Sequence, residues 1–401
     1  MLGLEASSQA DPHLVTTPPP VIRVLTLTPF YPNAANDAEG CFVAEPLREI
    51  REFGVSSCVL AVQPVHRATA GSKTAAPDVV SIRYLCVPGG IGLASSGAFL
   101  YQALLAKVRN MHRSQRIDLI HAHSALPCGH AAWLLSRKLK IPFVVTVHGL
   151  DAFHDNQVRG YFGARCRRVA QSVYRSASRV ICISDKVASK VGDNAVAPLN
   201  TKVIYNSVDA DMFFSAPVDP LPNTILSVGN LIPIKGHEVL LRAMSSVLTT
   251  YRNLTCEIIG DGPERERLSK LARDCNIRNS VRFLGRQSRK QVADAMRRCT
   301  LFVLPSRYEG LGCVYLEAMS TGKVAIACRG QGIDEIIRHG RNGWLIDGDN
   351  LPELIAALTE LLGDVQLRRQ IGAAARRTVL ERFTSSHQAS ELAALYRECV
   401  A

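Results

Sequence analysis

The sequence lacks the cysteine and low-complexity patterns that would assign it to a specialised class of protein. Its 12 Cys are scattered from Cys41 to Cys399, and no two stand at C-x-x-C spacing. The scattered Cys therefore indicate neither a zinc site nor a dithiol redox motif. In a reducing compartment we expect these Cys to behave as small buried apolar residues. The 28 Gly and 20 Pro follow no period, which excludes collagen-like chains.

Long hydrophobic runs are also missing. The longest, such as 143–147 and 324–327, fall far short of the ~20 residues that a membrane-spanning helix needs. The first twenty residues contain no Lys or Arg and no apolar segment typical of a secretory signal. We therefore expect a disordered lead-in over 1–20 and a cytoplasmic location.

The remaining composition is that of a globular protein with a strong positive charge. The 401 residues are 47% hydrophobic and 20% charged, and this length favours two domains. The net charge is +12, and residues 101–190 alone hold fifteen Lys and Arg against four Asp, a net charge of +11. This concentration of charge indicates a polyanionic surface as a partner.

Short β-branched runs alternate with longer helical patterns such as 239–248 and 264–275. Most of the short runs are continuously apolar, as buried parallel strands are. The alternation predicts an α/β chain with parallel sheets covered by helices on both faces. The expected strands are 21–28, 58–62, 81–85, 119–123, 143–147, 180–183, 203–205, 224–228, 255–259, 281–284, 301–304 and 323–327.

A proline-rich segment divides the chain. Phe214–Asn223 holds three Pro in ten residues, which is typical of a linker. We expect an N-terminal domain over 21–213, a C-terminal domain over 224–384, and a helical tail over 385–401 that returns to the first domain. Two doubly wound domains side by side leave a cleft between the carboxyl ends of their strands, where such sheets bind ligands.

The most informative segment runs from Pro305 to Met319 and contains EGLG followed by LEAM. A strand ends in a glycine-containing loop here, and we expect a helix to begin at about Gly312. Such a helix start presents unpaired N–H groups to an anion. On the residues alone, it is equally open that Glu309 complements the helix dipole and Glu317 is a solvated helix residue.

This segment resembles the E-x7-E signature of the retaining family 4 glycosyltransferases, which have the GT-B fold. Further motifs resemble that family in register over about residues 22–385. They are GCF at 40–42, HGLD at 148–151, NSVD at 206–209, SVGNLIPIKG at 227–236, GDGP at 260–263, GQGIDEI at 330–336 and NGWL at 342–345. The resemblance implies two doubly wound Rossmann-like domains across a cleft, with the acceptor on the first and a nucleotide-diphosphate sugar on the second.

One position departs from the family pattern. The family usually has Arg where this chain has Asn230. Arg binds phosphate with two charge-assisted hydrogen bonds, whereas Asn offers one neutral amide, which leaves Lys235 as the cation for the diphosphate. The wording GNLxPxKGHE also resembles a subgroup that builds cell-surface polysaccharides such as teichuronic acid.

The resemblance gives each motif residue a role. Glu317 is implied to accept hydrogen bonds from the ribose hydroxyls, and Glu309 to contact the donor sugar. Lys235 is expected to stabilise the negative charge that develops on the leaving diphosphate, the alternative being a solvated surface Lys. The expected donor-binding set is Gly40, Gly229, Asn230, Leu311, Gly312, Cys313, Val314 and Glu317.

Histidines and aspartates of the first half complete the candidate site. His148 follows the expected strand 143–147 at its carboxyl end and is implied to be catalytic beside the donor sugar, or else to cap the strand end. Asp151 orients the acceptor or sugar, or is a helix N-cap. His121 and His123 share one face of a strand, where packing or a position at the edge of the cleft is favoured over a metal pair.

The sequence predicts an enzyme that needs neither a metal nor a cofactor besides its donor substrate. Asp209 and Asp211 stand at Asp-x-Asp spacing, but a turn explains them, so we identify no pair of Asp suited to a sugar-nucleotide metal.

Four arginines lie on a helix that is expected to begin near Gln157. They are Arg165, Arg167, Arg168 and Arg175. Two interpretations are open: the solvated face of an amphipathic helix, or a patch that docks on an anionic membrane leaflet and suits a lipid-linked acceptor. Binding to nucleic acid is not favoured, because neither stacking aromatic residues nor a recognition motif accompanies the cations.

Taken together, these features predict a retaining, hexosyltransferase-like enzyme of cell-surface polysaccharide synthesis. It would move a sugar from a nucleotide-diphosphate sugar to a glycan or lipid-linked acceptor, in the cytoplasm or at the inner face of the membrane. The alternatives are an epimerase or phosphorylase with the same architecture, or a non-catalytic scaffold that binds polyanions at a membrane. No motif specifies the base, sugar, acceptor, linkage or oligomeric state.

Overall fold

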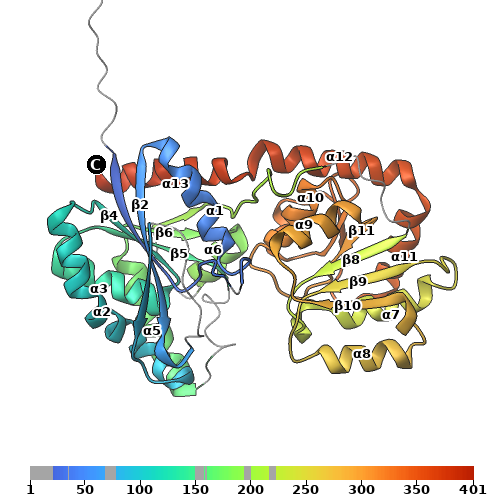
Figure 1. The fold of residues 1–401 in the computed structure, drawn as a ribbon, viewed down its shortest axis with the longest axis horizontal. Coiled ribbons are helices and arrows are strands. Elements are labelled where there is room, and N and C mark those ends of the chain that lie inside the picture. The colour runs from blue at the N-terminus through green and yellow to red at the C-terminus, as the bar shows by residue number, and fades with distance from the viewer. Residues whose placement is uncertain are drawn as a thin grey trace, which may run out of the picture.

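The computed structural model describes residues 21–34, 36–67, 78–149, 158, 160–193, 200–215 and 223–401. Two α/β domains lie side by side along the long axis of the molecule (Figure 1). Each is built on one parallel sheet with helices on both faces, as the alternation of apolar runs and helical patterns predicts.

The first sheet has seven parallel strands in the order β3-β2-β1-β4-β5-β6-β7. Its inner strands β4 and β5 are buried along their whole length, because helices cover both faces. The strands are β1 Ile22–Thr28, β2 Val55–Pro64, β3 Val79–Tyr84, β4 Leu119–His123, β5 Phe143–Val147, β6 Arg179–Cys182 and β7 Thr201–Val203.

The second sheet has six parallel strands in the order β10-β9-β8-β11-β12-β13. The strands are β8 Thr224–Val228, β9 Thr255–Ile259, β10 Val281–Gly285, β11 Leu301–Val303, β12 Ala325–Cys328 and β13 Trp344–Ile346. Twelve of the thirteen strands overlap the expected ones, although β7 shares only Val203 with the expected strand 203–205. β13 was not expected as a strand, because its three apolar residues follow a glycine turn and are too few to show a period.

Helices cover both sheets and link them a second time (Figure 1). The helices are α1 Cys41–Glu49, α2 Gly89–Ser114, α3 His130–Leu139, α5 Gly160–Ser176, α6 Asp185–Asp193, α7 His237–Val247, α8 Arg265–Asp274, α9 Arg289–Arg298, α10 Cys313–Ser320, α11 Leu351–Gly363, α12 Val365–Arg382 and α13 Ser385–Val400.

The last helix, α13, lies on the first domain. Its residues Leu392, Leu395 and Tyr396 are buried in a cluster with Val24 and Leu119 of the first sheet. Thr384 accepts a hydrogen bond from the backbone N–H of His387, which caps the start of this helix. The chain therefore passes between the domains both at the linker and at the junction of α12 with α13.

One described helix, α2, is long and apolar enough to cross a membrane by length and composition alone, with a mean hydropathy of 1.3. Counting continuous apolar runs did not reveal it, because Gly and Ser interrupt its apolar residues. Leu100, Leu104 and Val108 of this helix are fully buried in the core of the first domain.

Four sequence predictions fall wholly or partly outside the described residues. The lead-in 1–20, Asp151 and the linker residues 216–222 lie there. The expected start of the arginine-bearing helix near Gln157 also lies there, and the described helix α5 begins at Gly160.

Candidate active site

The motif residues gather where the carboxyl ends of the two sheets face one another. His148 follows β5, Asn230 follows β8, and the loop with Glu309 follows β11. The two domains touch here: a Cβ atom on Gly310 would come within 2.9 Å of the carbonyl oxygen of His148. A side chain at this glycine would push the domains apart, so glycine permits the close approach.

Lys235 reaches the site from a short 3₁₀ helix, Pro233–Lys235. Gly236 ends this helix with φ 71°, and a Cβ atom there would lie 2.0 Å from the carbonyl oxygen of Pro305. The Lys235 stem passes over Gly229, where a Cβ atom would stand 3.7 Å from Cδ. These two glycines place the Lys235 ammonium against the loop that follows β11.

Lys235 Nζ donates a hydrogen bond of 2.6 Å to Glu309 Oε1. The Lys235 side chain is 19% exposed and that of Glu309 is 11% exposed, so water screens this ion pair only weakly. Glu309 is held further by Gln331, whose Oε1 accepts a hydrogen bond of 3.1 Å from the Glu309 backbone N–H. The pair brings the expected diphosphate cation and the expected sugar-contacting acid together.

Helix α10 begins directly beside this pair. Gly312 precedes it with φ 89°, and a Cβ atom there would lie 2.6 Å from the ring of Tyr315. Leu311 is buried, which anchors the loop. The N–H groups of the first helical residues, Cys313 and Val314, lack acceptors within the helix, as at every helix start. This corner combines an ammonium group with the positive end of a helix.

The carboxylate of Glu317, one turn along α10, is linked to the first domain through Arg289. Its Oε1 accepts a hydrogen bond of 2.8 Å from Arg289 Nη1, at the start of α9. Arg289 Nη2 donates to Glu45 Oε1 of α1, in the first domain. All three side chains are less than 10% exposed, so Glu317 is not the solvated helix residue of the alternative interpretation.

His148 turns its ring into the first domain. Its Nε2 lies 2.9 Å from His123 Nδ1, and the two rings are stacked. Phe30 and Phe42 pack around it. Burial lowers the pKa of His148 to about 3, so the imidazole is neutral near pH 7.

The histidine pair on β4 has packing and hydrogen-bonding partners. His121 bonds to Tyr396 of α13 and to Thr146 of β5, both at 2.7 Å. Burial lowers the pKa of His121 to about 3. Its two ring nitrogens are thereby engaged within the protein, in agreement with the packing role favoured for this residue.

The remaining expected donor contacts lie at strand ends. Gly40 precedes α1 with φ 69°, where a Cβ atom would come within 2.3 Å of the backbone of Phe30. Gly229 is half-buried and Asn230 is exposed at the carboxyl end of β8. The four arginines of the expected membrane patch lie on α5, remote in sequence from these loops.

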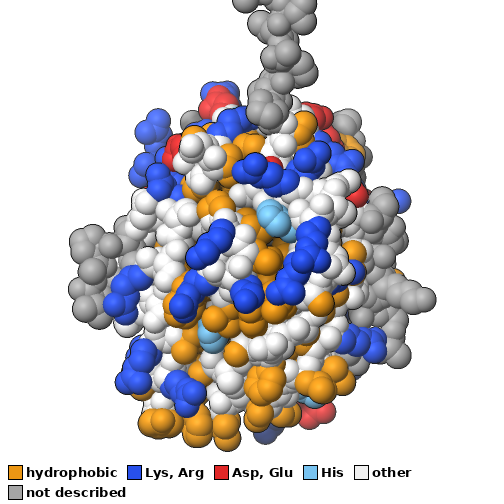
Figure 2. Space-filling model, turned by 90° about the vertical axis from the view of Figure 1, so that its left-hand side faces the viewer, with side chains coloured by type: hydrophobic (Ala, Val, Ile, Leu, Met, Phe, Trp, Pro, Cys, Tyr) orange, Lys and Arg blue, Asp and Glu red, His pale blue; other side chains and the backbone are white. Residues whose placement is uncertain are grey.

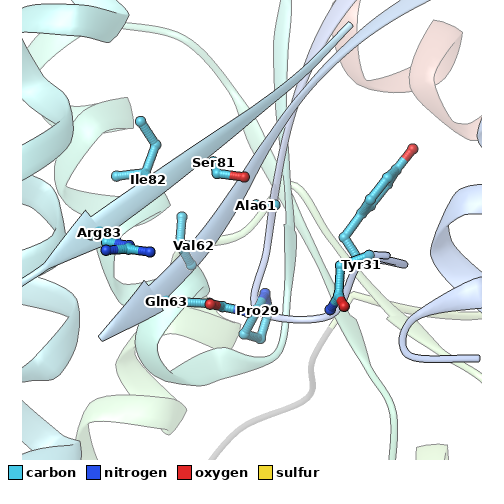
Figure 3. Close-up of a pocket in the computed structure, with 9 residues that line it drawn as sticks. Pro29, Tyr31, Ala61, Val62, Gln63, Ser81, Ile82 and Arg83 are labelled. Carbon is cyan, nitrogen blue, oxygen red and sulfur yellow. The ribbon is translucent and has the colours of Figure 1, made fainter. Parts of the chain in front are cut away.

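A pocket opens at the carboxyl ends of β1, β2 and β3. In Figure 3, Gln63 lies beside Pro29, and Arg83 borders the pocket from β3. Tyr31, at the mouth of the Gly40 loop, also contributes to its lining. Polar groups and one cation therefore line a recess on the first domain.

Sequence reasoning missed three residues that hold the site together: Arg289, Glu45 and Gln331. A capping box formed by Ser288 and Gln291 starts α9 and places Arg289 in its first turn. The Ser-x-x-Gln spacing was readable from the sequence. Nothing in the sequence reveals that Glu45, 244 residues away, completes the pair.

Two family models match the chain. The model of the Glycosyltransferase Family 4 matches residues 43–212, and the model of the Glycosyl transferases group 1 matches residues 209–378. Together they match most of both α/β domains and all the described motif residues outside the GCF motif at 40–42.

Individual proteins agree with these models. An uncharacterized glycosyltransferase of Methanocaldococcus jannaschii is 32% identical over 265 residues, which cover 66% of this chain and 71% of that protein. A Bacillus subtilis glycosyltransferase named for teichuronic acid biosynthesis is 28% identical, covering 77% and 80%. The structure of HepE from Anabaena in complex with UDP superposes with a TM-score of 0.72 at 21% identity, covering 94% and 100%.

Proposed function

We propose that this chain, which belongs to the glycosyltransferases, moves a sugar from a nucleotide-diphosphate sugar to a hydroxyl of a glycan or lipid-linked acceptor. The anomeric configuration of the sugar is retained. The family assignment rests on a family 4 domain followed by a group 1 domain. Its two Rossmann-like domains form the GT-B fold. The relatives are named as glycosyltransferases, which does not favour the epimerase, phosphorylase and scaffold alternatives.

The observation that carries this proposal is the Lys235–Glu309 ion pair at the start of α10. A diphosphate seated against α10 would take the ammonium of Lys235 as its counter-charge, together with the N–H groups of Cys313 and Val314. The sugar then lies over Glu309, facing the turn at His148 and Gly149 of the opposite domain. HepE, with the same fold, was crystallised with UDP, which supports a nucleotide donor.

The residues act on charges that appear during transfer. As the bond between sugar and phosphate breaks, negative charge grows on the diphosphate, and Lys235 with the α10 start stabilises it. Positive charge grows on the anomeric carbon, and the Glu309 carboxylate stabilises it and orients the sugar. The acceptor hydroxyl attacks the same face, and its proton passes to the leaving phosphate oxygen.

Two further assignments belong to this proposal. Glu317 binds the ribose hydroxyls, and the neutral His148 contacts a sugar hydroxyl rather than supplying a charge. Lys235 takes the place of a metal ion as the cation for the diphosphate, so the reaction needs no metal. The pocket beside Arg83 and Gln63 is the proposed site of acceptor recognition, because it lies at the carboxyl ends of strands in the first domain, where open parallel sheets bind ligands.

A panel of nucleotide-diphosphate sugars tests the proposal by thermal shift. A donor present at 100 times its Kd should stabilise the native state by ~2.7 kcal/mol, and addition of EDTA should leave this stabilisation unchanged. With the matching donor and an acceptor, nuclear magnetic resonance of the product should show the anomeric configuration of the donor. A panel without any stabilising donor would overturn the function, and an inverted product would overturn retention.

We also propose that the first domain docks on an anionic membrane surface. Arg165, Arg168 and Arg175 of α5 are exposed, and near them Tyr161 and Phe162 expose 72% and 38% of their surface. Figure 2 shows Lys and Arg side chains with hydrophobic side chains between them on the face of the first domain that lies at the left in Figure 1. Cations beside exposed aromatic and aliphatic groups fit the boundary between lipid headgroups and chains, and the B. subtilis relative supports a role in cell-surface polysaccharide synthesis.

Replacement of the three exposed α5 arginines with Gln should weaken binding to vesicles that contain phosphatidylglycerol by about two orders of magnitude, at ~1 kcal/mol for each lost cation. Sedimentation with vesicles measures this. The matched control replaces the exposed Arg273, Arg278 and Arg298 of the second domain and should bind as the wild type does. Equal binding of the wild type to neutral phosphatidylcholine vesicles contradicts electrostatic docking.

A further inference from the structure

Three charged side chains are buried together at the domain interface, separate from the ion pair of Lys235 with Glu309. Arg289 lies between Glu317 of its own domain and Glu45 of the opposite domain. The exposed fractions of the side chains are 8% for Arg289, 9% for Glu317 and 5% for Glu45. Charges are seldom buried to this extent unless they are paired, so the two domains depend on each other here.

Several contacts fix the Arg289 guanidinium. Its Nη1 bonds Glu317 at 2.8 Å and also reaches Cys41 Sγ at 3.1 Å, at the first turn of α1. Its Cζ lies 5.0 Å from the ring centre of Phe213. The Arg289 backbone N–H donates to the Asp37 carboxylate, so that the first domain also caps the start of α9.

Two atoms of this cluster are not satisfied by the described residues. Arg289 Nε is buried without a hydrogen-bond partner among them. Glu317 uses Oε1 for Arg289, and none of the described residues donates a hydrogen bond to Oε2. A carboxylate with one oxygen fixed by a guanidinium presents its other oxygen in a defined direction, which suits a pair of vicinal hydroxyls.

We propose that Arg289 is a positioning residue that holds Glu317 for the donor ribose. Through its contact with Glu45, Arg289 also links Glu317 to the first domain, so that donor binding and domain closure are coupled. This rests on the proposed function, in which Glu317 binds ribose. A nucleotide that engages Glu317 then favours the arrangement in which Glu45 reaches Arg289.

Three variants of the full-length protein separate the two links. Arg289→Met should raise the Kd for UDP or GDP at least tenfold, and Arg289→Lys, which cannot span both carboxylates, should raise it less. Glu45→Gln leaves Arg289 and Glu317 paired but weakens closure, so by linkage it should raise the Kd less than Arg289→Met does and lower kcat for transfer about tenfold. It should also reduce the donor-induced compaction seen by small-angle X-ray scattering.

The exposed neighbour Lys290 provides the matched control, and Lys290→Met should behave as the wild type. Coupling is overturned if Arg289→Met and Arg289→Lys bind the nucleotide normally, or if Glu45→Gln closes and turns over normally. A failure of the wild type to bind any nucleotide would instead contradict the proposed function. Should Arg289→Met not fold, Arg289→Lys and Glu45→Gln still decide the outcome.

Discussion

Lys235→Ala should abolish thermal stabilisation by the donor and lower kcat/KM by roughly 10²–10³-fold. Removal of one fixed electrostatic donor from a developing oxyanion typically has an effect of about this size. Lys235 is the cation that the structure places at the start of α10, and Asn230 offers no charge to replace it. Steady-state kinetics at varied donor concentration, with thermal shift alongside, measure both effects.

Two further variants show whether the effect is specific to Lys235 and to its charge. The exposed Lys270, on α8 of the same domain, provides a control, and Lys270→Ala should bind and turn over donor normally. Lys235→Arg retains a cation and should recover part of the binding if the site needs charge. Undiminished stabilisation of Lys235→Ala by the same donor would remove Lys235 from the diphosphate site.

Glu309→Gln should separate binding from chemistry. The amide keeps the size of the side chain but loses the charge that stabilises the anomeric carbon, so the rate of transfer should fall by roughly 10²-fold or more. Free UDP or GDP should bind at least as tightly as to the wild type, because Glu309 no longer neutralises Lys235. Calorimetry for the nucleotide and a transfer assay for the rate test the two halves.

Glu353 offers a matched control for this variant, since it is also paired with a cation, Arg329, but on the surface of the second domain. Glu353→Gln should change neither the rate nor the binding. Weaker nucleotide binding by Glu309→Gln would mean that Glu309 supports the diphosphate site instead of competing for its cation. A normal rate of transfer would exclude Glu309 from the chemistry.

Most of the sheets and much of the site could be predicted because the signals are local. Buried parallel strands such as 119–123 and 143–147 are apolar runs with sharp ends, and the structure reproduces both ranges. The loops that carry Lys235 and Glu309 both begin at the carboxyl ends of neighbouring strands, β8 and β11, and this brings the two side chains together. Strand β13 was not predicted, because its three apolar residues are too few to show a period.

The partners of Glu317 could not be predicted, because they depend on how two domains meet. Glu45 and Arg289 are far apart in the sequence, and their contact needs both domains in place. The sequence alone left Glu317 open as a solvated helix residue, which its burial at 7% exposure excludes. Long-range ion pairs of this kind require three-dimensional coordinates.

The double passage of the chain between the domains restricts how they can move. At the second passage the backbone itself is tied to the first domain: the Val208 N–H donates to the carbonyl oxygen of Phe383, and the Ser385 N–H donates to that of Val208. Helix α13 also supplies Tyr396 to His121 on β4. The C-terminal helix therefore completes the interior of the first domain as well as connecting it to the second.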